Sequence, residues 1–301
     1  MPTRIDHVII AAPDLTLLEE TFTRLGFTVV GGGTHPHLGT RNRIVVLGDG
    51  YIELLAIADT ASVSPTLRDR IAHGGGWVGY ALQSDNIAAE ASMMRQRGAD
   101  VRGPTAGQLL APDGTARSWQ VVTVGAGDLW AAAFPLPFLI QHDSAGARHQ
   151  RELAGADALT PHANGSTRLL GVSLRVTDLA TLRDRYERAY ALTPATAQAR
   201  SAAEEGVITY PLARGREWIS LIQPRYASVA IESSTGPVDS VMSVRVGVAD
   251  LAPVERAIWH AGFAATPVPG SICVTLPTIT ATLDFSVSSL AGGQNRASRP
   301  Q

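Results

Sequence analysis

The chain has 301 residues, 45% of which are hydrophobic, and a formal net charge of −2. This length indicates two domains of ordinary size. The weak net charge, with acids and bases interspersed, argues against a nucleic-acid surface or a basic face for membranes. Cys273 is the only cysteine, which excludes an intrachain disulfide and any multi-cysteine metal site.

The first residues lack the pattern of a signal peptide. No apolar run approaches the length of about 20 residues that is needed to span a bilayer. We therefore expect a soluble, cytoplasmic protein.

The first predicted unit covers residues 4–57 and has the order strand, helix, strand, strand, strand. Its helix, over residues 15–25, is indicated by an apolar face, a capping residue before it and a glycine after it. These residues are Leu18, Phe22, Leu25, Asp14 and Gly26. The glycine-rich stretch 31–42 is predicted to be a loop.

The same pattern of strand, cap and helix starts three more times. The later starts are predicted at Trp77–Leu82, Leu169–Asp178 and Ser243–Asp250. In three of the four units a glycine follows the cap at a nearly constant spacing, which indicates an internal repeat. We expect two modules in residues 1–142, a linker over 143–167, two further modules in 168–290 and a disordered tail over 291–301.

Two polar residues of the first unit are unusual for strands that pack into a core. Alternate side chains of a strand share a face, so His7 lies among isoleucines and Glu53 among apolar neighbours. A buried carboxylate is costly unless it is paired or binds a metal. An imidazole and a carboxylate on inward faces are half of a metal site. The alternatives are a core histidine bonded to a carbonyl, and a glutamate paired with Arg41 or Arg43 or acting as a general base.

The glycine-rich stretch adds four polar candidates. His35 and His37 flank a proline, and Thr40 and Asn42 follow them. Such histidines are mostly solvated, but either one offers a third metal ligand or a general acid. Thr40 and Asn42 are candidates for hydrogen bonds to a substrate.

Together these motifs resemble the glyoxalase-like branch of the vicinal oxygen chelate superfamily. The matching stretches are 5–8, 35–42, 48–54, 76–82 and 136–140. The resemblance implies an α+β fold of four βαβββ modules, arranged as two domains with curled mixed sheets. It also implies that the inward strands of a module pair hold a divalent metal ion.

In that family the ligands come from the first and last strands of the modules. By resemblance, His7 matches the first-strand ligand, Glu53 the last-strand ligand of module one, and Gln141 the last-strand ligand of module two. Zn, Mn, Ni and Fe all stay open as the metal. Ser173 and Ser220 occupy the related positions of module three, and a hydroxyl pair is a poor divalent-metal site.

The resemblance supports two classes of function. The first is a metal-dependent isomerase or lyase acting on a small molecule with vicinal oxygens, with Glu53 moving the proton. The second is a non-catalytic protein that binds a small molecule, like the resistance proteins of the superfamily. An extradiol-type dioxygenase would need His35 or His37 as a second histidine ligand. We expect no nucleic-acid or membrane partner, and a homodimer stays open.

Overall fold

The computed structural model describes residues 2, 4–125, 129–132, 136–145, 149, 152–155, 160–195, 204–212, 215–224, 240–277, 279 and 281–288. The predicted tail over 291–301 lies outside these residues. No helix in the described part of the chain has the length and apolar character needed to cross a bilayer.

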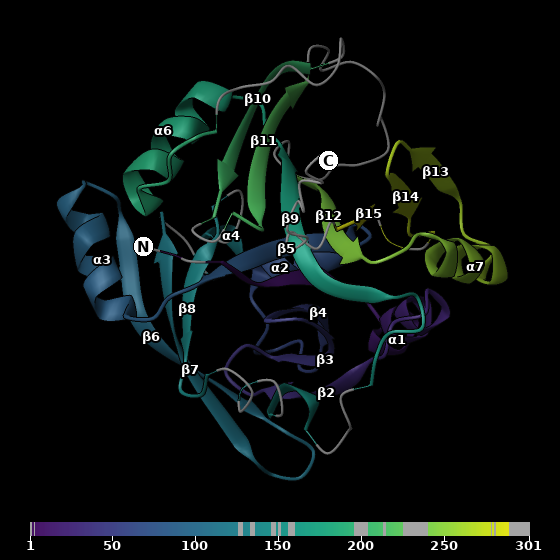
Figure 1. Ribbon diagram of the computed structural model, residues 1–301. Coiled ribbons are helices and arrows are strands. Elements are labelled where there is room, and N and C mark those ends of the chain that lie inside the picture. Colours follow the sequence, from purple (N-terminus) through teal and green to yellow (C-terminus); the bar gives the residue numbers. More distant parts are fainter. Residues whose placement is uncertain are drawn as a thin grey trace, which may run out of the picture.

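The first half of the chain forms a closed eight-stranded barrel (Figure 1). Its strands are β1 (Ile5–Ala11), β2 (Val30–His35), β3 (Thr40–Leu47), β4 (Gly50–Ile57), β5 (Gly76–Gln83), β6 (Val101–Leu110), β7 (Ala116–Val124) and β8 (Phe138–His142). Its helices are α1 (Leu15–Arg24), α2 (Pro65–Ala72), α3 (Ile87–Gln96) and α4 (Leu129–Ala132). The strand order is β1-β4-β3-β2-β6-β7-β8-β5, so the first and last strands of modules one and two adjoin each other.

The second half forms a seven-stranded sheet with the order β10-β11-β9-β12-β15-β14-β13. Its strands are β9 (Ser166–Arg175), β10 (Glu204–Pro211), β11 (Trp218–Pro224), β12 (Ser240–Val248), β13 (Ala265–Val268), β14 (Ser271–Thr275) and β15 (Thr282–Val287). Its helices are α6 (Leu179–Tyr190) and α7 (Ala252–Ala261). The expected α+β fold with two curled mixed sheets is confirmed, although the described part of module three has only two strands after its helix.

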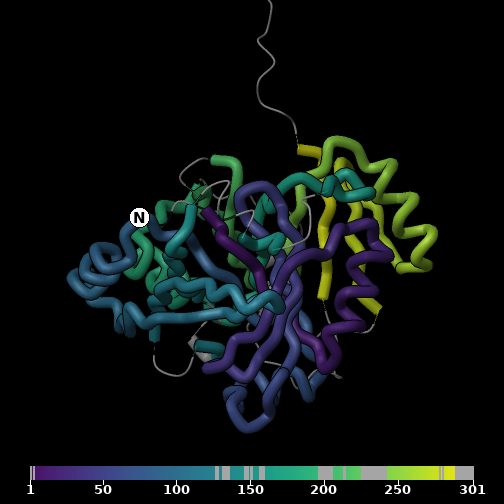
Figure 2. The backbone as a smooth tube through the Cα atoms, turned by 90° about the horizontal axis from the view of Figure 1, so that it is seen from below, coloured from purple at the N-terminus to yellow at the C-terminus, as the bar shows by residue number. Residues whose placement is uncertain are grey.

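One hydrophobic core joins the two sheets. The Phe27 and Phe285 rings stack with centroids 5.8 Å apart, and Trp77 Nε1 donates to the Thr282 carbonyl at 3.2 Å. Figure 2 shows α1 beside the C-terminal elements, where Arg24 donates to the Ala261 carbonyl. The barrel and the second sheet therefore bury apolar surface against each other.

The helix ends follow from capping chemistry. Asp14 caps α1 as predicted, because its Oδ1 accepts from the Thr16 N–H at 2.9 Å. Asn86 caps α3, and its Oδ1 accepts from the Ala89 N–H at 3.1 Å.

The prediction of a loop over residues 31–42 was also wrong. This stretch forms the end of β2, a short turn and the start of β3. The glycines are needed for close backbone packing within a strand: a Cβ on Gly31 would lie 1.8 Å from the Leu153 carbonyl oxygen, and one on Gly32 would lie 2.1 Å from that of Asn42. Glycine therefore marks close approach here.

Candidate functional site

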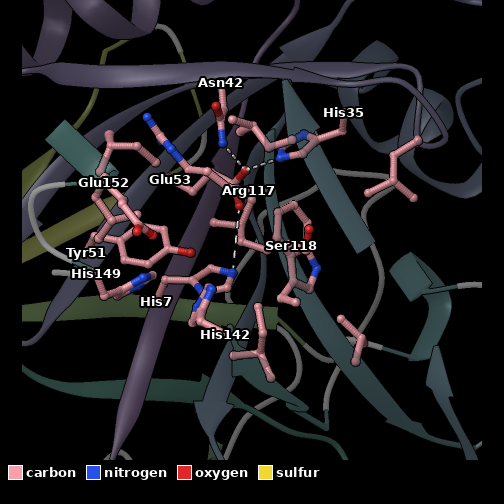
Figure 3. A pocket seen from close by; sticks show the side chains of 18 of the residues that line it. His7, His35, Asn42, Tyr51, Glu53, Arg117, Ser118, His142, His149 and Glu152 are labelled. Carbon is pink, nitrogen blue, oxygen red and sulfur yellow. Dashed lines mark hydrogen bonds and ion pairs between the residues drawn. The ribbon is translucent and has the colours of Figure 1, made fainter. Parts of the chain in front are cut away.

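The barrel encloses a cavity of about 340 Å³ (Figure 3). Its apolar wall includes Ile9, Ile44, Leu55, Val121, Phe138 and Ile140. Polar side chains from six strands, β1 to β4, β7 and β8, and from the segment after β8 project into it. A mostly apolar cavity with a few convergent polar groups is typical of a small-molecule site.

Glu53 of β4 lies at the centre of the polar groups. Asn42 Nδ2 donates to Glu53 Oε1 at 2.6 Å. Nε2 of His35 lies 3.7 Å from the same oxygen, and Nε2 of His7 lies 3.7 Å from Oε2. All four side chains are at least nine-tenths buried. The structure therefore brings together four of the residues that the sequence indicated.

His7 and His35 both direct Nε2 toward Glu53, because Nδ1 of each ring is hydrogen-bonded to a neighbouring side chain. His7 Nδ1 lies 2.7 Å from Asp6 Oδ1, and His35 Nδ1 lies 2.9 Å from Thr40 Oγ1. An ionised carboxylate only accepts hydrogen bonds, so His7 Nδ1 must be the donor. Such partners fix the orientation and tautomer of metal-binding histidines.

The pKa values of His35 and Asp6 are both shifted in the direction that favours binding of a cation. Burial lowers the pKa of His35, although Glu53 opposes this shift, so its imidazole is neutral near pH 7. Burial alone would raise the pKa of Asp6, but hydrogen bonds and charge from His142 and His7 hold it well below its ordinary value. Asp6 is therefore ionised although it is buried.

The donor set at Glu53 fits a divalent metal ion. With the proton of each ring on Nδ1, the two Nε2 atoms and the carboxylate offer lone pairs toward one region, and a cation between them would bind all three. Two histidines and one carboxylate are a recurring ligand set for transition metals in proteins.

The local fold explains how distant residues meet. β1 and β4 are parallel neighbours, so His7 and Glu53 lie on adjoining strands. β2 and β3 form a hairpin in which His35 pairs directly with Thr40. The glycine-rich stretch thus places His35 opposite its own hydrogen-bond partner.

Two predicted site residues lie elsewhere. Gln141 is not in the cavity, because it alternates in β8 with Ile140 and His142, which line it. Its Oε1 accepts from the Ile87 N–H at 2.7 Å and so supports the start of α3. His37 is exposed in the turn between β2 and β3 and does not line this cavity.

The sequence analysis missed several polar groups of the cavity. The His7 ring stacks on Tyr51, with centroids 4.6 Å apart, and Asp6 also accepts from His142 Nε2 at 3.1 Å. His149 and Glu152 come from the segment that we expected to be a linker. The alternation in β8 could have indicated His142, but nothing in the sequence placed His149 at the barrel.

The related positions of the second sheet carry different chemistry. Ser173 pairs with Ser220 on the neighbouring strand. The Ser220 hydroxyl is buried and lies 3.0 Å from Thr209 Oγ1. The hydroxyls of Ser220 and Thr209 therefore form a hydrogen bond with each other.

A family profile described as "glyoxalase-like domain" matches residues 5–190. The chain belongs to this family. The match contains the whole barrel, including His7, His35 and Glu53, and it confirms the resemblance to the vicinal oxygen chelate superfamily. No curated protein matches the chain in sequence.

Solved structures share the fold over nearly the whole chain. A hypothetical protein from Staphylococcus aureus has 13% identity and a TM-score of 0.65, covering 95% of this chain and 99% of that one. A mutant of 4-hydroxymandelate synthase from Streptomyces coelicolor has 16% identity and a TM-score of 0.62, covering 95% and 94%. A fusion of a xylose isomerase-like TIM barrel and 4-hydroxyphenylpyruvate dioxygenase has 12% identity and a TM-score of 0.54, covering 98% and 51%. At these identities the likeness concerns the fold alone.

Proposed function

We propose that this glyoxalase-like protein is a metal-dependent enzyme of the isomerase or lyase type. Its substrate is a small molecule with two neighbouring oxygens, bound in the barrel cavity. The observation that carries the proposal is the convergence of the Nε2 atoms of His7 and His35 on Glu53, each at 3.7 Å.

His7, His35 and Glu53 would hold the metal ion. A divalent ion in this position supplies Lewis-acid chemistry, polarising a carbonyl of the vicinal oxygen pair. Asp6 and Thr40 hold the two imidazoles from behind, and loss of such partners typically costs 10- to 100-fold in metal affinity.

The protein itself supplies the proton transfer and the dry environment. Glu53 takes the proton from the carbon beside the substrate carbonyl and returns it to the neighbouring carbon. Burial, with the charges of Asp6 and Glu53, raises the pKa of Tyr51 well above its ordinary value, so the phenol stays protonated and can donate to a substrate oxygen. The apolar wall excludes water from the reacting atoms.

A second candidate is an extradiol-type dioxygenase. The specific observation in its favour is that His35 completes a set of two histidines and one carboxylate with His7 and Glu53. Oxygen consumption separates the candidates: the isomerase or lyase works without O₂ and with Zn, Mn or Ni, whereas the dioxygenase needs Fe(II) and consumes O₂.

The test is the metal content of the protein purified without a His tag. We expect at least one equivalent of divalent metal in the wild type by mass spectrometry, and one equivalent less in His7→Ala, His35→Ala and Glu53→Gln. His37→Ala is the matched control, because this histidine is exposed and lies outside the cavity.

An undiminished metal content in all three variants would place the ion elsewhere and overturn the proposed site. No binding of Zn, Mn, Ni or Fe at any concentration tested would overturn the enzyme mechanism. The cavity would then be a binding pocket of a non-catalytic protein.

A further inference from the structure

A second cluster of ligand-type side chains lies on the opposite side of His7. Asp6, His142 and His149 each offer one ligand atom, and these atoms all lie within 4.8 Å of one another. Among the described residues no other group of three such side chains is as close. The three residues come from β1, from the last position of β8 and from the segment after β8. The closed barrel therefore assembles the cluster.

The anion of this cluster is deeply buried. Asp6 is 1% exposed, and its Oδ1 accepts from His7 Nδ1 at 2.7 Å and from His142 Nε2 at 3.1 Å. A buried ionised carboxylate needs positive partners. A cation bound beside Asp6 would be such a partner.

His149 provides an independent sign of a ligand site. The residue is 8% exposed, and its Nε2 is buried without a hydrogen-bond partner. Its Nδ1 lies 3.2 Å from Ser144 Oγ. When Nδ1 donates to this hydroxyl, Nε2 carries a free lone pair, which is the tautomer that a metal ion requires.

The rings of His142 and His149 lie close together. Their centroids are 4.0 Å apart at an interplanar angle of 37°. Figure 3 shows both rings beside His7 and Tyr51 at the same side of the cavity.

We propose that Asp6, His142 and His149 form a second metal site, of the zinc class, next to the Glu53 site. Two imidazole nitrogens and one carboxylate oxygen are ligands that Zn²⁺ prefers, and a metal ion would take the place of the proton between His142 Nε2 and Asp6 Oδ1. Three protein ligands leave a position open for water or substrate. The assignment does not depend on a metal at His7, His35 and Glu53. Asp6 links the two sites, because it also holds His7 Nδ1.

Co²⁺ is the probe, since its visible absorption reports both its stoichiometry and its coordination number. Metal-free wild type is titrated with Co²⁺ and then with competing Zn²⁺, and bound metal is counted by mass spectrometry. We expect two equivalents in the wild type. We expect one equivalent in His149→Gln and in His142→Gln, and the intense bands of a four- or five-coordinate ion should be lost with the equivalent that disappears.

The equivalent that survives in His149→Gln should be the one that His35→Ala removes, and the double variant should bind none. Affinity at the second site should fall by more than the roughly 10- to 100-fold typical of losing an outer-shell partner. His73→Gln is the control, because this histidine is exposed and lies outside the cluster. His149→Gln is the preferred variant because residue 149 lies outside the barrel strands, and circular dichroism checks its fold.

Unchanged Co²⁺ stoichiometry and affinity in His149→Gln would overturn the second site, as would a wild type that binds no metal at all. If His35→Ala keeps both equivalents while His149→Gln loses one, the second site stands and the proposed function fails. If His35→Ala loses one equivalent of metal and His149→Gln loses none, the proposed function stands and the second site fails.

Discussion

The two sheets of this protein share a repeat but differ in the polar groups that they bury. In the barrel, Glu53 and the Nε2 atoms of His7 and His35 face one another, all of them able to accept. In the second sheet, Ser220 is bonded to the hydroxyl of Thr209 on the adjoining strand. The repeated strands preserve packing in both halves, whereas the convergent lone pairs occur in the barrel.

Charged groups of the second sheet also compensate each other. Arg245 of β12 donates from Nε to Asp284 Oδ2 of β15 at 2.6 Å, and the Arg245 guanidinium lies 5.5 Å from the centroid of the Trp218 ring. The cation and the anion on these neighbouring strands form an ion pair, although Asp284 Oδ1 has no hydrogen-bond partner. The comparison teaches that buried polar groups indicate a ligand most strongly where several of them face one another across a cavity.

The largest effect is expected where the two sheets meet. Phe285→Ala should lower the free energy of unfolding by about 3–5 kcal/mol, because it removes a fully buried ring from the shared core. Chemical denaturation followed by circular dichroism should show one transition, shifted as a whole. Two separate transitions, with only the second one shifted, would show that the halves do not share a core in the energetic sense.

A smaller change in stability is expected from the titration of Glu217 with pH. Burial raises the pKa of Glu217 to about 7, and its Oε2 accepts from the Ile5 N–H of β1 at 2.6 Å. The folded protein thus binds the proton more tightly than the unfolded chain, whose glutamates titrate near pH 4.3. This contribution to stability is complete below about pH 4 and is lost as the pH rises to about 7.

Urea unfolding at pH 5 and pH 8 measures this contribution. From pH 5 to pH 8 the free energy of unfolding of the wild type should fall by about 2–3 kcal/mol more than that of Glu217→Gln, which cannot ionise. Equal losses in the two proteins would mean that the carboxyl group has an ordinary pKa in the folded state.

The smallest effect concerns the support of the Glu53 site. Thr40→Val keeps the shape of the side chain but removes the hydroxyl that holds His35 Nδ1 at 2.9 Å. We expect about 10- to 100-fold weaker metal binding with the ligands intact. The matched change in the second sheet, Thr209→Val, should leave the affinity unchanged. Equal metal affinity in Thr40→Val and the wild type would argue that His35 is not a ligand.

The sequence was sufficient to predict the repeated modules and the inward-facing residues of β1 and β4. Apolar periodicity and capping residues predicted the helices, and strand alternation placed His7 and Glu53 on inward faces. The same alternation excludes Gln141 from the cavity, since Ile140 and His142 line it. Choosing between the two faces of β8 required knowing which one closes the barrel, and this depends on packing between distant strands.

Other features could not be read from local patterns. The glycines at 31 and 32 indicated a loop, yet they are strand residues that let the backbones of Leu153 and Asn42 approach. The strands β6, β10 and β13 were not predicted; in β13 every residue is exposed, so it shows no apolar face. The position of His149 depends on how the segment after β8 folds back, for which the sequence carries no periodic signal.

The close approach at Gly31 bears on how the site could diverge. A Cβ there would overlap the carbonyl oxygen of Leu153, so main chain lies directly on main chain where the segment after β8 meets β2. The backbone position at Leu153 is therefore set by atoms common to every residue type, except at the glycine itself. The cavity-lining side chains at 152 and 153 can be exchanged while this backbone contact is kept, so substitutions at these two positions could change which ligand the cavity binds.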